Sequence, residues 1–233
     1  MIQFMRFVPQ ALERVARVVL ELPEDLLVLP LPHERLQLVP RGAALPRHDL
    51  WVPLMSLPGL LGLGAGPLGD VFPYIQPGPA TPVQARARRI GLCWAGSPLH
   101  SNDHNRSMPD RFLAALNGLP ETSFFGLTRG APPPPLERHV DPFGATGSLQ
   151  AYRGLLQSLD LVITVDTSVA HLAGALGRPV WVLLSAAADW RWLEDREDSP
   201  WYPSARLFRQ ATVGDWAGLM ARVRSELERP APP

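Results

Sequence analysis

The sequence predicts an α/β fold in which parallel strands alternate with helices, and three observations lead to this class. Residues 161–165 form an unbroken apolar run of the length of a buried strand. A helical stretch rich in small residues follows at 168–176, and a second apolar run follows at 179–184. Strands that alternate with helices in this way pair in parallel, with helices on both faces of the sheet.

The same alternation begins at residue 89. Apolar runs predict strands at 89–95 and 122–127, and helical periodicity predicts helices at 109–117 and 148–158. The second half of the chain is therefore predicted to form a Rossmann-like lobe.

The first half carries fewer elements. Its pattern predicts a helix over 2–14, a buried strand at 16–21 and a second short strand at 49–52. Residues 77–88 are rich in proline and then in arginine, which is typical of a linker. We expect an N-terminal lobe over 1–78, a linker over 79–88, a second lobe over 89–229 and a tail over 230–233.

The composition favours a small ligand over a charged polymer. Lys+Arg and Asp+Glu both number 22, so no net charge attracts the chain to nucleic acid or to an anionic membrane. Cys93 is the single cysteine, which excludes a disulfide within the chain and fits a reducing cytoplasm. No segment approaches the roughly 18 apolar residues of a membrane span, and we expect a cytoplasmic protein.

The sharpest local feature is the turn formed by Asp166, Thr167 and Ser168, between the apolar run and a helix. Ligands of open parallel sheets lie beyond the carboxyl ends of strands, where a helix N-terminus offers free N–H groups to an anion. Thr167 and Ser168 share one helix face with His171, so these side chains are candidates for holding a phosphate. The alternative is that Asp166 or Thr167 only caps the helix and that His171 satisfies a buried hydrogen bond.

A second loop follows the strand that ends at Ala95. Gly96 permits close approach of the backbone, Ser97 offers a hydroxyl, and Arg106 is suited to charge-assisted bonds with a diphosphate. Neighbouring strand ends would thus supply complementary parts of one site.

Two other patterns are weaker. His100, Asp103 and His104 resemble metal ligands, but a polar loop with two imidazoles is more often solvated, and we expect no metal. Residues 64–69 match G-x-G-x-x-G, but no strand precedes them and a proline interrupts them, so we expect a loop rather than a dinucleotide fingerprint.

Residues 189–203 place three of the seven tryptophans in one connection. Indoles here could stack on a base or cover an acceptor. Buried aromatic side chains more often anchor a long loop to its domain, which is the interpretation we favour.

The sequence resembles glycosyltransferase family 9, the heptosyltransferase-like group, and in particular the module that follows tetratricopeptide repeats in many bacterial proteins. The matching segments are 90–98, 105–107, 159–177, 189–192 and 206–210. The resemblance implies a GT-B fold of two Rossmann-like lobes, in which the second lobe binds a nucleotide-diphosphate-sugar without a metal or other cofactor. The acceptor would bind across the cleft.

The resemblance also implies roles for individual residues. The residues that would face the donor diphosphate are Gly96, Ser97, Arg106, Asp166, Thr167, Ser168 and His171. Thr128 and Arg129 fall, by a looser match, where such proteins contact the nucleoside.

One departure concerns the N-terminus. Family members usually begin with a strand and a Gly-Asp turn, whose aspartate is the expected general base, and here Met1 stands at that point. The N-terminal lobe is therefore expected to be reduced and to lack its first strand. The remaining N-terminal carboxylates are expected to be surface charges; they are Glu13, Glu21, Glu24 and Asp25.

The expected function is transfer of a hexosyl or heptosyl group from a nucleotide-diphosphate-sugar to a hydroxyl of a glycan, lipid-linked or protein acceptor. Two alternatives stay open: a non-catalytic nucleotide-sugar-binding remnant and a sugar-nucleotide epimerase.

Overall fold

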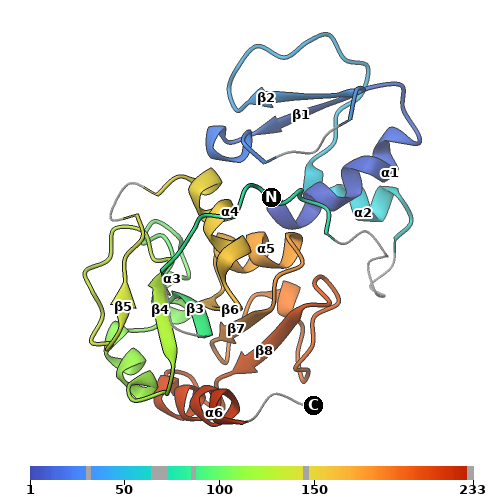
Figure 1. Ribbon diagram of the computed structural model, residues 1–233. Coiled ribbons are helices and arrows are strands. Elements are labelled where there is room, and N and C mark those ends of the chain that lie inside the picture. Colours follow the sequence, from blue (N-terminus) through green and yellow to red (C-terminus); the bar gives the residue numbers. More distant parts are fainter. Residues whose placement is uncertain (30–32, 64–72, 85–87, 144–146, 230–233) are drawn as a thin grey trace.

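A computed structural model of the chain describes residues 1–29, 33–63, 73–84, 88–143 and 147–229. Figure 1 shows a smaller part with two strands and a larger part built on a six-stranded sheet. The glycine pattern at 64–69 and the tail at 230–233 lie outside the described residues.

The six-stranded sheet is parallel throughout and has the order β5-β4-β3-β6-β7-β8. In chain order this is 3-2-1-4-5-6, the strand order of a Rossmann fold, so the predicted architecture of the second half is confirmed. The strands are β3 (Arg88–Cys93), β4 (Thr122–Gly126), β5 (His139–Val140), β6 (Leu161–Val165), β7 (Val180–Leu184) and β8 (Ala205–Arg209). β5 and β8 were not predicted from the sequence.

Helices cover both faces of this sheet (Figure 1). Alternate residues of β6 belong to opposite cores: Val162 packs with α4 and α5, and Ile163 packs with η4 and α6. Burial on both faces explains why β6 is an unbroken apolar run. The covering helices are η4 (Asp110–Leu116), α4 (Leu149–Ser158), α5 (Ser168–Ala175) and α6 (Trp216–Glu228). Of these, η4 is a 3-10 helix, and α6 was not predicted.

The first part of the chain begins with two short helices and two parallel strands. Its elements are η1 (Ile2–Phe7), α1 (Val8–Leu12), β1 (Val18–Leu22), η2 (Glu24–Leu26), β2 (Leu36–Pro40), η3 (Leu54–Ser56) and α2 (Leu57–Leu60). The helix predicted over 2–14 ends at Leu12 in the structure, two residues earlier than predicted. The strand predicted at 16–21 begins at Val18, two residues later than predicted. The four carboxylates expected at the surface are all exposed.

The strand predicted at 49–52 is wrong. Leu50 and Trp51 are 85% and 79% exposed, and the segment pairs with no strand among the described residues. The second strand is β2, which pairs in parallel with β1 from Val18 opposite Leu36 to Leu22 opposite Pro40. A short apolar run does not by itself specify a strand, because pairing depends on a neighbour elsewhere in the chain.

The two parts share one hydrophobic core. Phe4, Met5 and Phe7 of η1 are buried in the same cluster as the residues of α5. The described portion of the predicted linker lies on α4, where Thr81 N donates to Gly154 O at 3.0 Å and Ser158 Oγ donates to Thr81 O. No helix in the described part of the chain is both long and apolar enough to cross a membrane.

Candidate functional site

The candidate site lies at the point where the strand order of the sheet reverses. β3 and β6 are adjacent and parallel, with Cys93 opposite Thr164 at their carboxyl ends. The chain then leaves the two strands towards opposite sides of the sheet. Ligands of open α/β sheets bind at this switch point.

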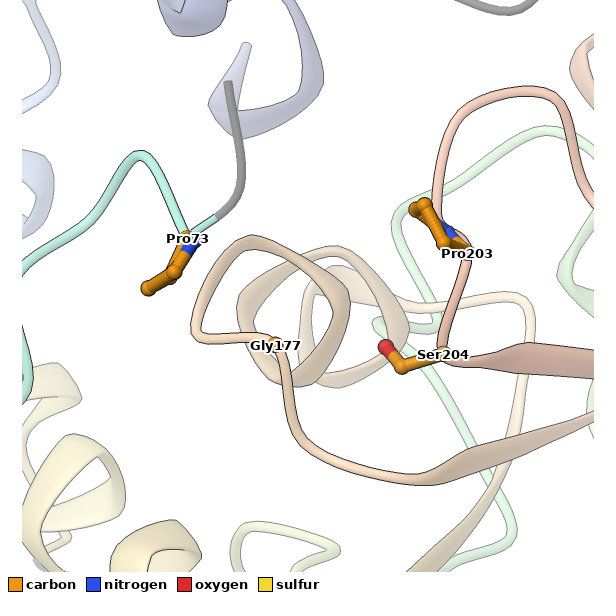
Figure 2. A pocket seen from close by; sticks show the side chains of 4 residues that line it. All are labelled: Pro73, Gly177, Pro203 and Ser204. Carbon is orange, nitrogen blue, oxygen red and sulfur yellow. The ribbon is translucent and has the colours of Figure 1, made fainter. Parts of the chain in front are cut away.

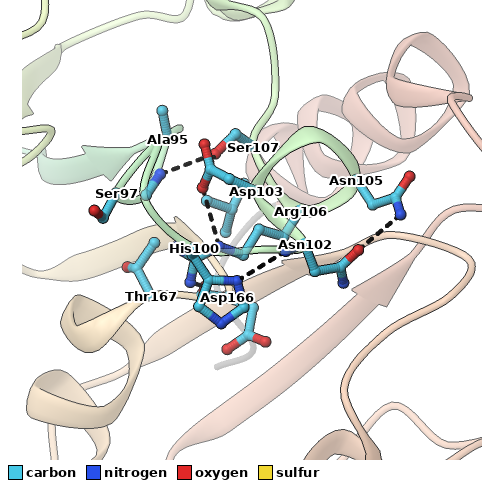
Figure 3. A network of polar contacts seen from close by, with 12 residues as sticks. Ala95, Ser97, His100, Asn102, Asp103, Asn105, Arg106, Ser107, Asp166 and Thr167 are labelled. Carbon is cyan, nitrogen blue, oxygen red and sulfur yellow. Dashed lines mark hydrogen bonds and ion pairs between the residues drawn. The ribbon is translucent and has the colours of Figure 1, made fainter.

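A hydrogen bond joins the two loops that begin there. Arg106 donates from Nη1 to the backbone oxygen of Asp166 at 2.8 Å, and its Nε lies 3.1 Å from Asp103 Oδ1 (Figure 3). Ser107 Oγ donates to the same Asp103 oxygen at 2.9 Å and accepts from Gly96 N at 2.9 Å. The structure thus brings together the two loops, after β3 and after β6, in which the sequence predicted the candidate site residues.

Gly96 lies against the Arg106 side chain. A Cβ atom at this position would overlap the guanidinium of Arg106, so glycine is needed for that side chain to lie against the loop. Ser97 is exposed, and its Oγ accepts a hydrogen bond from Leu99 N at 3.3 Å.

The side chains of Thr167 and Ser168, in the turn between β6 and α5, point in different directions: Thr167 is buried and Ser168 is exposed. Thr167 Oγ1 caps α5 by accepting from Val169 N at 3.3 Å, and it lies 3.1 Å from Thr164 Oγ1 beside the buried Cys93. The capping interpretation therefore holds for the Thr167 hydroxyl. Ser168 is exposed, and its hydroxyl has no hydrogen-bond partner among the described residues.

The two ring nitrogens of His171 differ: Nδ1 has a hydrogen-bond partner, and Nε2 has none among the described residues. Its Nδ1 lies 2.9 Å from the Tyr202 hydroxyl, and its ring stacks on Trp192 at 5.5 Å between centroids. Burial, together with the charges of the Met1 amino group and Arg191, lowers the pKa of His171 from 6.5 to about 3. The imidazole is therefore neutral near pH 7. Tyr202 was missed, because nothing in the local pattern links residues 31 positions apart.

The carboxyl of Asp166 lies in a low-dielectric environment. Burial raises the pKa of Asp166, and the charge of Asp189 raises it further, while the Trp192 indole, Arg106 and Arg191 act in the opposite direction. Asp166 is thus less strongly acidic than an exposed aspartate.

Packing explains most of the tryptophan-rich connection. Trp192 and Trp201 are buried, which confirms the favoured interpretation for them, and Trp201 Nε1 donates to Arg191 O at 2.6 Å. Trp190 differs because it is 56% exposed. It lines a hollow of about 400 Å³ beyond β7 and β8, together with Ala186, Ala187, Ala188, Asp189, Leu193, Glu194 and Arg209.

The two residues matched to the nucleoside are structurally unlike each other. Thr128 Oγ1 accepts from Trp94 N at 3.0 Å and so connects the ends of β4 and β3. The Arg129 side chain is about half exposed and lies 4.0 Å from Asp25. Among the described residues, neither side chain makes a hydrogen bond to residues 96–107.

Two of the three residues considered as metal ligands, His100 and Asp103, have other partners. Asp103 holds Arg106 and Ser107, and His100 Nδ1 accepts from Asn102 N at 3.2 Å. In the described ranges, no three His, Cys, Asp or Glu side chains are grouped so as to hold a metal ion.

A second hollow, of about 250 Å³, is lined by Pro73, Gly177, Pro203 and Ser204 (Figure 2). Gly177 and Ser204 precede β7 and β8, so this hollow lies at the amino edge of the sheet. It is therefore separate from the loops that meet at the carboxyl edge.

Fold and site together define an α/β protein of the Rossmann-like class, with paired loops where such proteins bind ligands. The glycosyltransferase family 9 (heptosyltransferase) model matches residues 144–212, which contain Asp166, His171 and Tyr202. The resemblance drawn from the sequence is thereby confirmed over this range.

Protein FlbA of Caulobacter vibrioides is 26% identical to the chain over 204 residues, which cover 78% of this chain and 33% of FlbA. The chain therefore spans about a third of the length of this curated relative. No solved structure matches the chain.

Proposed function

We propose that the chain is a metal-independent glycosyltransferase that transfers a sugar from a nucleotide-diphosphate donor to an acceptor hydroxyl. The observation that carries this proposal is the hydrogen bond from Arg106 to the Asp166 backbone, beside the N-terminus of α5. This bond joins two segments that are rich in hydrogen-bond donors, at the point where the strand order reverses. One of the two segments lies in the range matched by the family model.

The charge distribution at this point suits a diphosphate. Arg106 uses Nε and Nη1 within the protein, and Nη2 has no partner among the described residues. The free Ser168 hydroxyl lies on the first turn of α5, where the helix dipole also favours negative charge. These groups would stabilise the charge that develops on the departing diphosphate, without a metal ion.

His171 and Asp166 would complete the donor site. A neutral imidazole donates a hydrogen bond from its open edge, and a carboxyl such as that of Asp166 is suited to bind a sugar hydroxyl. In this arrangement Gly96 and Ser97 line the diphosphate, and Thr128 and Arg129 lie towards the nucleoside.

The acceptor would enter from the side of the first part of the chain. η1 packs on α5, and the Met1 amino group is close enough to His171 to influence its pKa. The first part would thus act as the acceptor lobe of a GT-B arrangement.

Thermal unfolding with a panel of nucleoside diphosphates tests donor binding. A ligand at about 100 times its Kd adds about 2.7 kcal/mol of stability, or a Tm increase of roughly 5–10 °C in a chain of this size. If no nucleoside diphosphate changes the Tm, the proposed donor site is wrong.

Incubation with labelled sugar nucleotides then separates the candidate activities. Transfer or hydrolysis supports the transferase, isomerised donor indicates an epimerase, and saturable binding alone indicates a non-catalytic binding protein. Donor affinity should be equal in EDTA and in magnesium, because the proposal assigns the diphosphate to protein groups alone.

A further inference from the structure

We propose that Tyr202 is a positioning residue that fixes His171 in the tautomer with its proton on Nε2, so that this N–H is presented to the ligand of the α5 turn. The proposal rests on the proposed function for the identity of that ligand, a nucleoside diphosphate. The tautomer itself is a property of the protein alone.

The position of the Tyr202 hydroxyl is tightly determined. The residue is fully buried, and its ring lies against α5 at Gly174, where a Cβ atom would overlap the ring carbons. Its hydroxyl lies 2.9 Å from His171 Nδ1. The absence of a side chain at Gly174 is therefore what brings this hydroxyl to the imidazole, three residues earlier on the same helix.

The surroundings of Tyr202 determine which atom receives its proton. The Arg6 guanidinium, whose Cζ lies 5.0 Å from the Tyr202 ring centroid, hydrogen-bonds to the Tyr202 oxygen and can only donate. Tyr74, the other phenol in contact with Tyr202, donates its own proton to Ile2 O at 3.1 Å, so its oxygen is the competing acceptor for the Tyr202 proton. An imidazole nitrogen is a stronger acceptor than a phenol oxygen, so the Tyr202 proton points to His171 Nδ1.

A neutral His171 then has one possible tautomer. Burial and the charges of the Met1 amino group, Arg191 and Arg6 favour the neutral ring, against the opposing charge of Asp189. Because Nδ1 accepts, the single ring proton resides on Nε2. The Nε2 edge has no partner among the described residues, and His171 is partly exposed, so a ligand can reach it. Stacking on Trp192 holds the ring plane.

This arrangement matters for an anionic ligand. In the Nε2–H tautomer the imidazole donates to a phosphate oxygen, whereas in the other tautomer a nitrogen lone pair faces that oxygen and repels it. Losing one hydrogen bond to a charged group should weaken binding about tenfold or more. Tyr202→Phe removes the hydroxyl and keeps the ring against Gly174, so it isolates this effect.

Nitrogen-15 NMR of histidine-labelled protein at pH 7 is the decisive measurement. The chain has 6 histidines, and the signal of His171 is assigned by its loss in His171→Asn. In the unmodified chain we expect an unprotonated Nδ1 and a protonated Nε2. In Tyr202→Phe we expect averaged shifts from both tautomers, whereas Tyr152→Phe, another buried tyrosine, should leave the His171 signals unchanged.

Calorimetry with ADP, UDP and GDP provides the second readout. The nucleotide that binds the unmodified chain should bind Tyr202→Phe about tenfold more weakly. A protonated Nδ1 in the unmodified chain, or identical His171 spectra with and without the Tyr202 hydroxyl, would overturn the positioning role. If Tyr202→Phe does not fold, the spectrum of the unmodified chain still decides. If the spectra agree with the proposal but no nucleotide binds, the donor-site function is wrong and the tautomer assignment stands.

Discussion

Arg106 donates a hydrogen bond to the backbone oxygen of Asp166, a residue 60 positions later, and so joins the loops after β3 and β6. A second arginine joins the same two strands at the opposite edge of the sheet. Arg89 Nη2 lies 2.6 Å from Asp160 Oδ1, and both side chains are more exposed than Arg106. The chain thus contains an arginine of the candidate site and a second arginine that can serve as its structural control.

Arg106→Lys should weaken donor binding about tenfold. Lysine keeps the charge but loses the planar fork, so it cannot hold Asp103 and the Asp166 backbone while also donating to a diphosphate. Titration calorimetry with the best nucleoside diphosphate measures the change.

Arg89→Lys is the matched control. Its ion pair is exposed and should contribute about 0–1 kcal/mol to folding, with donor affinity unchanged within about twofold. Equal losses of affinity in the two variants would mean that Arg106 acts on sheet stability rather than on the ligand.

Gly174→Ala should destabilise the chain. The added Cβ overlaps the buried Tyr202 ring, and overpacking of this kind costs about 1–3 kcal/mol, which the better helix propensity of alanine offsets by about 1 kcal/mol. Urea unfolding should therefore give a loss of up to about 2 kcal/mol, accompanied by weaker donor binding because Tyr202 is displaced from His171.

Gly59→Ala controls for the general effect of the substitution. Gly59 lies in α2 with no atom near the added Cβ and no left-handed backbone, so alanine should be neutral or should stabilise by about 0.4–1 kcal/mol. Destabilisation by Gly59→Ala equal to that of Gly174→Ala would contradict the packing argument.

His171 should make folding sensitive to acid. Its pKa falls from 6.5 to about 3 in the folded chain, so between these values the unfolded chain binds a proton that the folded chain does not. Stability should therefore decrease as the pH falls through this window, by up to about 1.4 kcal/mol per unit. The raised pKa of Asp166 acts in the opposite direction, because the folded chain keeps that proton to higher pH.

His171→Asn separates the two contributions. Between pH 7 and pH 5 the unmodified chain should lose about 1–2 kcal/mol more than the variant in urea unfolding, since Asp166 is common to both. Parallel pH profiles would show that His171 is charged in the folded chain.

The elements that were predicted well are those whose signal is local. β6 has the predicted bounds because burial on both faces demands an uninterrupted apolar run. α6 also carried a local signal, with buried residues at helical spacing from Trp216 to Leu227, and was overlooked. The prediction of a strand at 49–52 was wrong because strand formation also requires a neighbouring strand, and this segment has none among the described residues.

The sequence by itself determined the α/β class, the resemblance to glycosyltransferase family 9 and the two loops that supply the candidate site, because each depends on residues close together in the chain. Only the tertiary structure decided that Arg106 meets Asp166, that Thr167 turns its hydroxyl inward and that Tyr202 holds His171. These contacts join residues that are distant in sequence or depend on which strands become neighbours. They are fixed by strand order and packing, which local periodicity does not encode.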